Sequence, residues 1–163
     1  MTARLLLGAF VPSHVLLSDP LTNTVGAGPF TELGQTERWI RNRVAFRESH
    51  GLCWYAVRER ENNTLIGNCG LLSRRTGVGE PEIGYLISAG HRGRGLASEA
   101  AEAVLAECRS AGLPRIRASL RPHNLASRRI VERLGLHFDR TGHDERGALD
   151  LWLVDLSTRD PIR

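Results

Sequence analysis

The chain has 163 residues, 41% of them hydrophobic and 25% charged, which is the composition of a single globular domain, residues 1–163, with one core. No apolar run approaches the roughly 20 residues of a membrane-spanning helix, and the N-terminal apolar stretch is too short for a secretory signal, so we expect a cytoplasmic protein. All 22 basic residues are arginine, which excludes lysine Schiff-base chemistry and a P-loop lysine. The net charge of +4 is spread along the chain, which gives little support to nucleic-acid binding.

The three cysteines, Cys53, Cys69 and Cys108, are scattered and form no CxxC pair. We expect them to be reduced thiols that serve as small buried hydrophobic residues. No group of His, Asp or Glu residues has metal-ligand spacing, so we predict no metal site.

Hydrophobic periodicity and turn residues divide the chain into strands and helices. In the first half of the chain we predict a strand at Arg4 to Phe10, mostly loop at Pro12 to Phe30, a helix from Thr36 to about Arg47, and strands at Cys53 to Arg58, Leu65 to Leu72 and Ile83 to Ile87. In the second half we predict a helix at Leu96 to Ser110, a strand at Arg115 to Arg121 and a helix at Asn124 to Leu134. A strand at Leu136 to Thr141, a polar turn at His143 to Gly147 and a last strand at Ala148 to Leu156 follow. Thr36 and Asn124 are the expected N-caps, and Gly51 is expected to end the first helix. The helix from Leu96 is a crossover between two strands that should lie parallel, beside an antiparallel hairpin. The fold class is therefore α/β with a mixed sheet.

A glycine-containing loop joins the strand that ends at Ile87 to the helix that begins near Leu96. Gly93 and Gly95 allow tight turns and close approach of a ligand, and the first turn of the helix has unpaired N–H groups. Together with the charges of Arg92 and Arg94, these features predict an anion site for a phosphorylated cofactor. A plain surface turn is the alternative interpretation of the loop taken alone.

Two common phosphate motifs are excluded. No GK[ST] sequence follows the loop, so it is not a Walker loop. Position 98, where a dinucleotide fingerprint would require glycine, is Ser98.

Three spaced motifs resemble those of the GNAT superfamily of N-acetyltransferases. Arg92-Gly-Arg-Gly95-Leu-Ala97 matches the superfamily signature Arg/Gln-x-x-Gly-x-Gly/Ala, and Asn124-x-x-Ser127 with Arg133-Leu-Gly135-Leu136 is similar to its last helix. With Glu82-Ile-Gly-Tyr added, the chain resembles the RimJ/RimL-like subgroup from about residue 65 to residue 138. The resemblance implies a mostly antiparallel sheet with a parallel, splayed middle strand pair and helices on both faces.

The resemblance also implies acetyl-CoA as the co-substrate. It assigns the pyrophosphate to the main-chain N–H groups of Arg92, Gly93, Arg94, Gly95, Leu96 and Ala97. It assigns the pantetheine arm to backbone groups of Leu86, Ile87 and Ser88 on one side and to Asn124 on the other. A simple N-cap is the alternative for Asn124.

Glu82 is the candidate general base, because an amine must lose a proton to attack a thioester and one water can relay that proton. A solvated strand-end carboxylate is the alternative for Glu82, and His123 or water is the alternative base. The resemblance implies Ser127 as the hydrogen-bond donor to the leaving sulfur, because Val131 occupies the position of the superfamily's helix tyrosine. A helix serine bonding to the Asn124 region is the alternative for Ser127.

The expected function is transfer of an acetyl group to a primary amine by direct attack, with a backbone N–H of the central strand stabilising the oxyanion. The resemblance favours a protein N-terminal amine as the acceptor. A small-molecule amine such as a polyamine or aminoglycoside, and a non-catalytic acyl-CoA-binding module, are the alternatives. A homodimer paired through the final strands is a further expectation.

Overall fold

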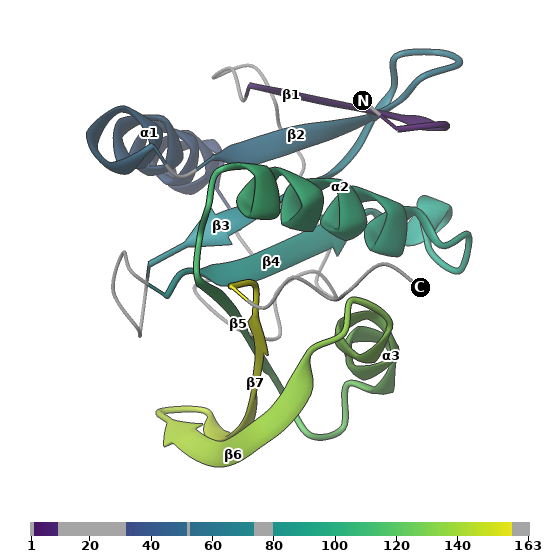
Figure 1. Ribbon diagram of the computed structural model, residues 1–163. Coiled ribbons are helices and arrows are strands. Elements are labelled where there is room, and N and C mark those ends of the chain that lie inside the picture. Colours follow the sequence, from purple (N-terminus) through teal and green to yellow (C-terminus); the bar gives the residue numbers. More distant parts are fainter. Residues whose placement is uncertain (1, 10–31, 52, 74–79, 158–163) are drawn as a thin grey trace.

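The computed structural model describes residues 2–9, 32–51, 53–73 and 80–157, which form one mixed sheet with helices packed on it (Figure 1). The elements are β1 (Leu5–Ala9), α1 (Leu33–His50), β2 (Trp54–Glu59), β3 (Leu65–Leu72), β4 (Glu82–Ile87), the short 3₁₀ helix η1 (Ala89–His91), α2 (Leu96–Ser110), β5 (Arg115–Leu120), α3 (Leu125–Arg133), β6 (His137–Asp144) and β7 (Gly147–Asp155). The strand order is β1-β2-β3-β4-β5-β7-β6. Within the described ranges, no helix combines the length and the apolarity needed to cross a membrane.

Each strand and helix predicted within these ranges is confirmed, with differences at the ends. Helix α1 begins at Leu33, so Thr36 lies inside the helix and Glu32 is the N-cap. Gly51 ends α1 with a left-handed φ of 69°, as expected. Strand β6 continues to Asp144, because Asp144 accepts the N–H of Arg146 and closes a shorter turn than predicted. The predicted loop at residues 12–30 lies outside the described residues.

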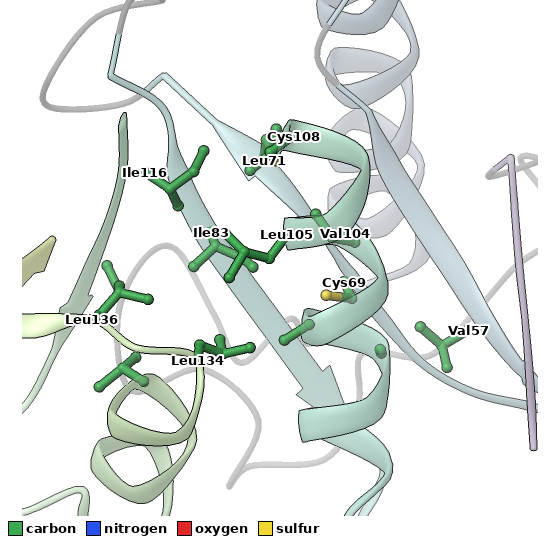
Figure 2. Packing of buried hydrophobic residues seen from close by; sticks show 14 of the residues in the cluster. Val57, Cys69, Leu71, Ile83, Val104, Leu105, Cys108, Ile116, Leu134 and Leu136 are labelled. Carbon is green, nitrogen blue, oxygen red and sulfur yellow. The ribbon is translucent and has the colours of Figure 1, made fainter. Parts of the chain in front are cut away.

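Helices cover both faces of the sheet. Successive strand residues point to opposite faces, and Ala56 packs with Ile40 of α1 whereas Val57 belongs to the core under α2. Helices α1 and α2 therefore lie on opposite faces. The main core contains α2, the inner faces of β3, β4 and β5, and residues at the end of α3, which meet near Ile83 and Leu134 (Figure 2).

The sheet is split between β4 and β5. Strand β4 pairs with β3 along its whole length, from Glu82 to Ile87. Its parallel pairing with β5, both strands being fully described, is confined to Glu82 opposite Arg117. Beyond that point β5 and β7 turn away from β4, and α3 lies beside the divergence (Figure 1). The splayed middle pair expected from the resemblance is therefore present.

Candidate active site

A cradle of backbone N–H groups lies at the carboxyl end of β4. Gly93 and Gly95 have φ values of 74° and 75°, in the left-handed region that favours glycine, and they turn the chain into α2. The N–H groups of residues 93–97 make no hydrogen bond to any described residue, as is typical of a helix start that faces an anion. The N–H of Arg92 instead closes the 3₁₀ turn on Ala89 O, so the predicted cradle begins one residue later.

The arginine side chains of the loop are engaged with protein groups. The Nε–H of Arg92 donates to Ile87 O at 2.9 Å, and Arg94 forms a 2.8 Å ion pair with Glu59. Arg4, before β1, donates to the carbonyl of Arg94. These contacts hold the loop against β4, β2 and the residue before β1. The positive charges of Arg92 and Arg94 remain beside the cradle.

The backbone of β4 alternates between two sides. The N–H of Ser88 donates to Ile66 O of β3, and the period of two then directs the backbone groups of Leu86 toward β3 as well. Ile83, Tyr85 and Ile87 direct theirs toward β5, where the pairing ends. Of the three residues predicted to contact pantetheine through the backbone, Ile87 faces the open side, and Leu86 and Ser88 are bonded within the sheet. The side-chain pattern alone did not distinguish these two edges.

Glu82 is buried at the start of β4, with only 6% of its surface exposed. Its Oε2 accepts a 2.8 Å hydrogen bond from the hydroxyl of Ser119 on β5. The alternative of a solvated carboxylate is therefore wrong. The neighbouring residues are not freely solvated either, because Pro81 is buried and Glu80 forms ion pairs with arginines of β5. Ser119 was missed because it is distant in sequence from Glu82.

An aromatic cluster flanks Glu82 on the same face of the sheet. Gly84, two residues along β4, lies under the ring of Trp54, where a Cβ at position 84 would come within 2.7 Å of that ring. Trp54 packs edge-on against Trp39, and Arg43 lies over both rings, at 4.5 Å from the Trp39 centroid and 5.1 Å from the Trp54 centroid. A glycine inside a strand was the available sequence signal for this close approach.

Helix α3 approaches β4 from the other face. Asn124 caps α3, and its Oδ1 accepts the N–H of Ser127 at 3.1 Å, which confirms the N-cap interpretation. The hydroxyl of Tyr85 donates to the carbonyl of Ser127 at 3.2 Å, and burial raises the pKa of Tyr85, so the phenol stays protonated. The hydroxyl of Ser127 makes no hydrogen bond to the described part of the chain. Val131, one turn later, is fully buried in the main core.

The predicted residues thus fall into three groups around β4. Glu82 lies on the α1 face together with Ser119, Ser127 lies on the α2 and α3 face, and the cradle lies at the strand's end. Glu82 and Ser127 therefore lie on opposite faces of β4. His123 is exposed in the connection from β5 to α3.

Known proteins share both the sequence pattern and the fold. Residues 4–137 match the family model described as an acetyltransferase (GNAT) domain. A Bacillus licheniformis relative named uncharacterized N-acetyltransferase p20 is 27% identical over 149 residues, 88% of this chain and 84% of the relative.

Solved structures agree in fold. A putative GnaT-family acetyltransferase from Bordetella pertussis superposes with a TM-score of 0.81 at 24% identity, covering 94% of this chain and 96% of that one. RimL, a ribosomal L7/L12 alpha-N-protein acetyltransferase solved with coenzyme A, gives a TM-score of 0.81 at 16% identity, covering 94% and 95%. The family match spans most of the chain and agrees with the split sheet and the glycine loop, so this chain belongs to the GNAT family of acetyltransferases.

Proposed function

We propose that this acetyltransferase transfers the acetyl group of acetyl-CoA to the α-amino group of a protein N-terminus by direct attack. The observation that carries the proposal is the organisation of β4. One strand has a buried carboxylate at its start, an unpaired backbone edge along its middle and an N–H cradle at its end. These are the parts that a thioester donor and an amine acceptor require.

The cofactor end is supported by the unpaired N–H groups. We assign the pyrophosphate to the N–H groups from Gly93 to Ala97, where the positive end of the α2 dipole also lies. Tyr85 presents its backbone groups, and Ile87 its N–H, to the open edge, where they would bond to the amides of the pantetheine arm, whereas Ile87 O already accepts the Nε–H of Arg92. When bound, acetyl-CoA supplies the thioester carbonyl that the amine attacks.

Glu82 is the proposed general base. An α-amino group, with a reference pKa of about 7.7 to 8.0, is partly neutral near pH 8, and a carboxylate or one relayed water accepts the proton released on attack. The hydrogen bond from Ser119 orients Glu82, and burial keeps competing water away from it. The acceptor would approach from the α1 face, where the Trp54 ring covers Gly84 beside Glu82.

Two donors complete the proposed chemistry. A backbone N–H on the open edge of β4 would stabilise the oxyanion, since a donor fixed in place before the reaction requires no reorganisation. The hydroxyl of Ser127 would hydrogen-bond the leaving sulfur. A hydrogen bond is sufficient there, because a thiol with a reference pKa near 8.5 leaves readily as a thiolate. Asn124, at the same helix start, would contact the pantetheine arm through its amide N–H₂ while its Oδ1 caps the helix.

The acceptor class is supported by the α-N-protein acetyltransferase among the structural relatives. The test is thiol release from acetyl-CoA with a panel of amines: peptides with free and with blocked N-termini, a polyamine and an aminoglycoside. The proposal expects turnover with free peptide N-termini and none with blocked ones. Turnover with the small amines alone would contradict the acceptor class. Acetyl-CoA binding with no turnover on any amine would indicate a non-catalytic module.

A further inference from the structure

Three side chains form a hydrogen-bonded and ionic chain beside the N–H cradle. The hydroxyl of Ser88, just after β4, lies 2.8 Å from Nδ1 of His91 in η1. Nε2 of His91 lies 3.8 Å from Oε2 of Glu59 at the end of β2. Glu59 also pairs with Arg94 of the cradle loop, at 2.8 Å. This series of side-chain contacts therefore connects Ser88 at the end of β4, through the His91 imidazole and Glu59, to the loop that we assign to pyrophosphate.

The charge on Glu59 decides the direction of the Ser88–His91 hydrogen bond. Although burial acts to raise the pKa of Glu59, hydrogen bonds from Asn62 and Arg94 hold it below its usual range, so Glu59 is ionised at neutral pH. A carboxylate favours a proton on the imidazole nitrogen that faces it, here Nε2. In neutral His91, Nδ1 is then the acceptor, and the Ser88 hydroxyl must donate to it.

Protonation of His91 reverses that bond. Both imidazole nitrogens are donors in the charged form, so Nδ1–H donates to the Ser88 oxygen. The Ser88 hydroxyl hydrogen then turns away from the imidazole and is available to another acceptor. In the chain, Ser88 stands between Ile87, which faces the open edge of β4, and the cradle loop, so a bound cofactor would lie in the same region.

We propose that binding of coenzyme A is coupled to proton uptake at His91, which converts Ser88 into a hydrogen-bond donor to the bound cofactor. An anion favours a positive charge beside it, so the bound and protonated states stabilise each other. This inference rests on the proposed use of the cradle for the cofactor. It assigns to His91 and Ser88 a role that the loop's backbone amides do not fill.

The charged groups around His91 determine how readily it is protonated before the cofactor binds. Glu59 of β2 favours the imidazolium, and the loop guanidiniums of Arg94 and Arg92 oppose it. Arg4 lies one contact further away, on the carbonyl of Arg94. A bound pyrophosphate would add negative charge on the loop side, and this charge would offset the effect of the two arginines on the imidazolium.

The test is calorimetric titration with dephospho-coenzyme A, which keeps the pyrophosphate but lacks the 3′-phosphate monoester that itself titrates near pH 6. Titrations in two buffers of different ionisation enthalpy give the number of protons taken up at pH 7. For the wild type we expect net uptake, and an affinity about fivefold higher at pH 6 than at pH 8, which corresponds to an average uptake of about 0.35 proton over that range.

The variants separate the two parts of the proposal. His91→Gln should abolish the uptake and the pH dependence while leaving the affinity at pH 8 within about twofold, and His143→Gln, an exposed histidine on β6, should change neither. Ser88→Ala should retain proton uptake and weaken binding at pH 6 more than at pH 8. An unchanged uptake in His91→Gln, or equal weakening at both pH values in Ser88→Ala, overturns the inference. If the wild type binds dephospho-coenzyme A without proton uptake, this inference fails and the proposed function stands. If it does not bind at any pH, the proposed function fails as well.

Discussion

The hydroxyl of Ser119 donates to Oε2 of Glu82 across the point at which β4 and β5 part. Immediately beside it, the N–H of Arg117 donates to Pro81 O, the backbone bond that closes the split at its base. The candidate base is therefore held by both halves of the sheet. A carboxylate fixed in this way keeps one orientation toward an acceptor amine that approaches from the α1 face.

Glu82→Gln should lower turnover about 10²-fold or more while leaving the affinity for acetyl-CoA unchanged, because the amide cannot accept the proton and the cradle is distant. Steady-state thiol release and calorimetric binding measure the two effects. Glu102→Gln, an exposed carboxylate on α2, is the matched control. A variant with wild-type turnover across the pH range would remove Glu82 from the mechanism.

Ser127→Ala should lower the turnover number and leave the KM for acetyl-CoA near the wild-type value, since its hydroxyl is proposed to act on the leaving sulfur. We expect a loss of about tenfold, the worth of a hydrogen bond of about 1.4 kcal/mol. Ser110→Ala is the control, because that exposed serine only bonds the carbonyl of Ala106. If Ser127→Ala acetylates a good amine at the wild-type rate, the assignment is wrong.

Tyr85→Phe should reduce stability by about 1 kcal/mol, because the ring remains in the core while the Ser127 carbonyl loses its donor. This bond attaches the first turn of α3 to β4, so cofactor affinity should fall as well. Urea unfolding and calorimetric binding measure the two effects.

Tyr55→Phe is the comparison for Tyr85→Phe. It removes an exposed hydrogen bond to Glu107 of α2 and should leave cofactor affinity unchanged. Equal effects of the two variants on affinity would contradict a specific role for the β4–α3 bond.

Acid should destabilise the fold partly through Glu99. Although burial acts to raise its pKa, hydrogen bonds from Thr2 and Arg4 hold the pKa of Glu99 below its ordinary value of 4.5. A carboxyl whose pKa is lower in the folded chain contributes stability above its unfolded pKa and loses it as pH falls. Between about pH 5.5 and 3.5, the melting temperature of Glu99→Gln should therefore fall less than that of the wild type. Parallel curves for the two proteins would show that Glu99 is not linked to folding.

Local patterns predicted the elements and the cradle well. Helix α2 has the predicted bounds, because apolar residues recur at helical spacing along it and Gly95 and Gly112 flank it, and strand β3 has them because the polar turn at Asn62 and Asn63 precedes it. The start of α1 was missed because Glu32 caps it without a side-chain hydrogen bond, so no cap signal marks the position. Asn124, by contrast, does form its side-chain cap and was found.

The sequence by itself determined that a glycine loop precedes a helix start, that Glu82 stands at the head of the preceding strand and that the motifs resemble those of an acetyltransferase family. These features depend on residues close together in the chain. Only the tertiary structure decided that Glu82 is buried against Ser119, that Ile87 rather than Leu86 faces the split, and that Glu59 reaches His91. Each of these depends on the register and separation of strands distant in sequence, which no local pattern fixes.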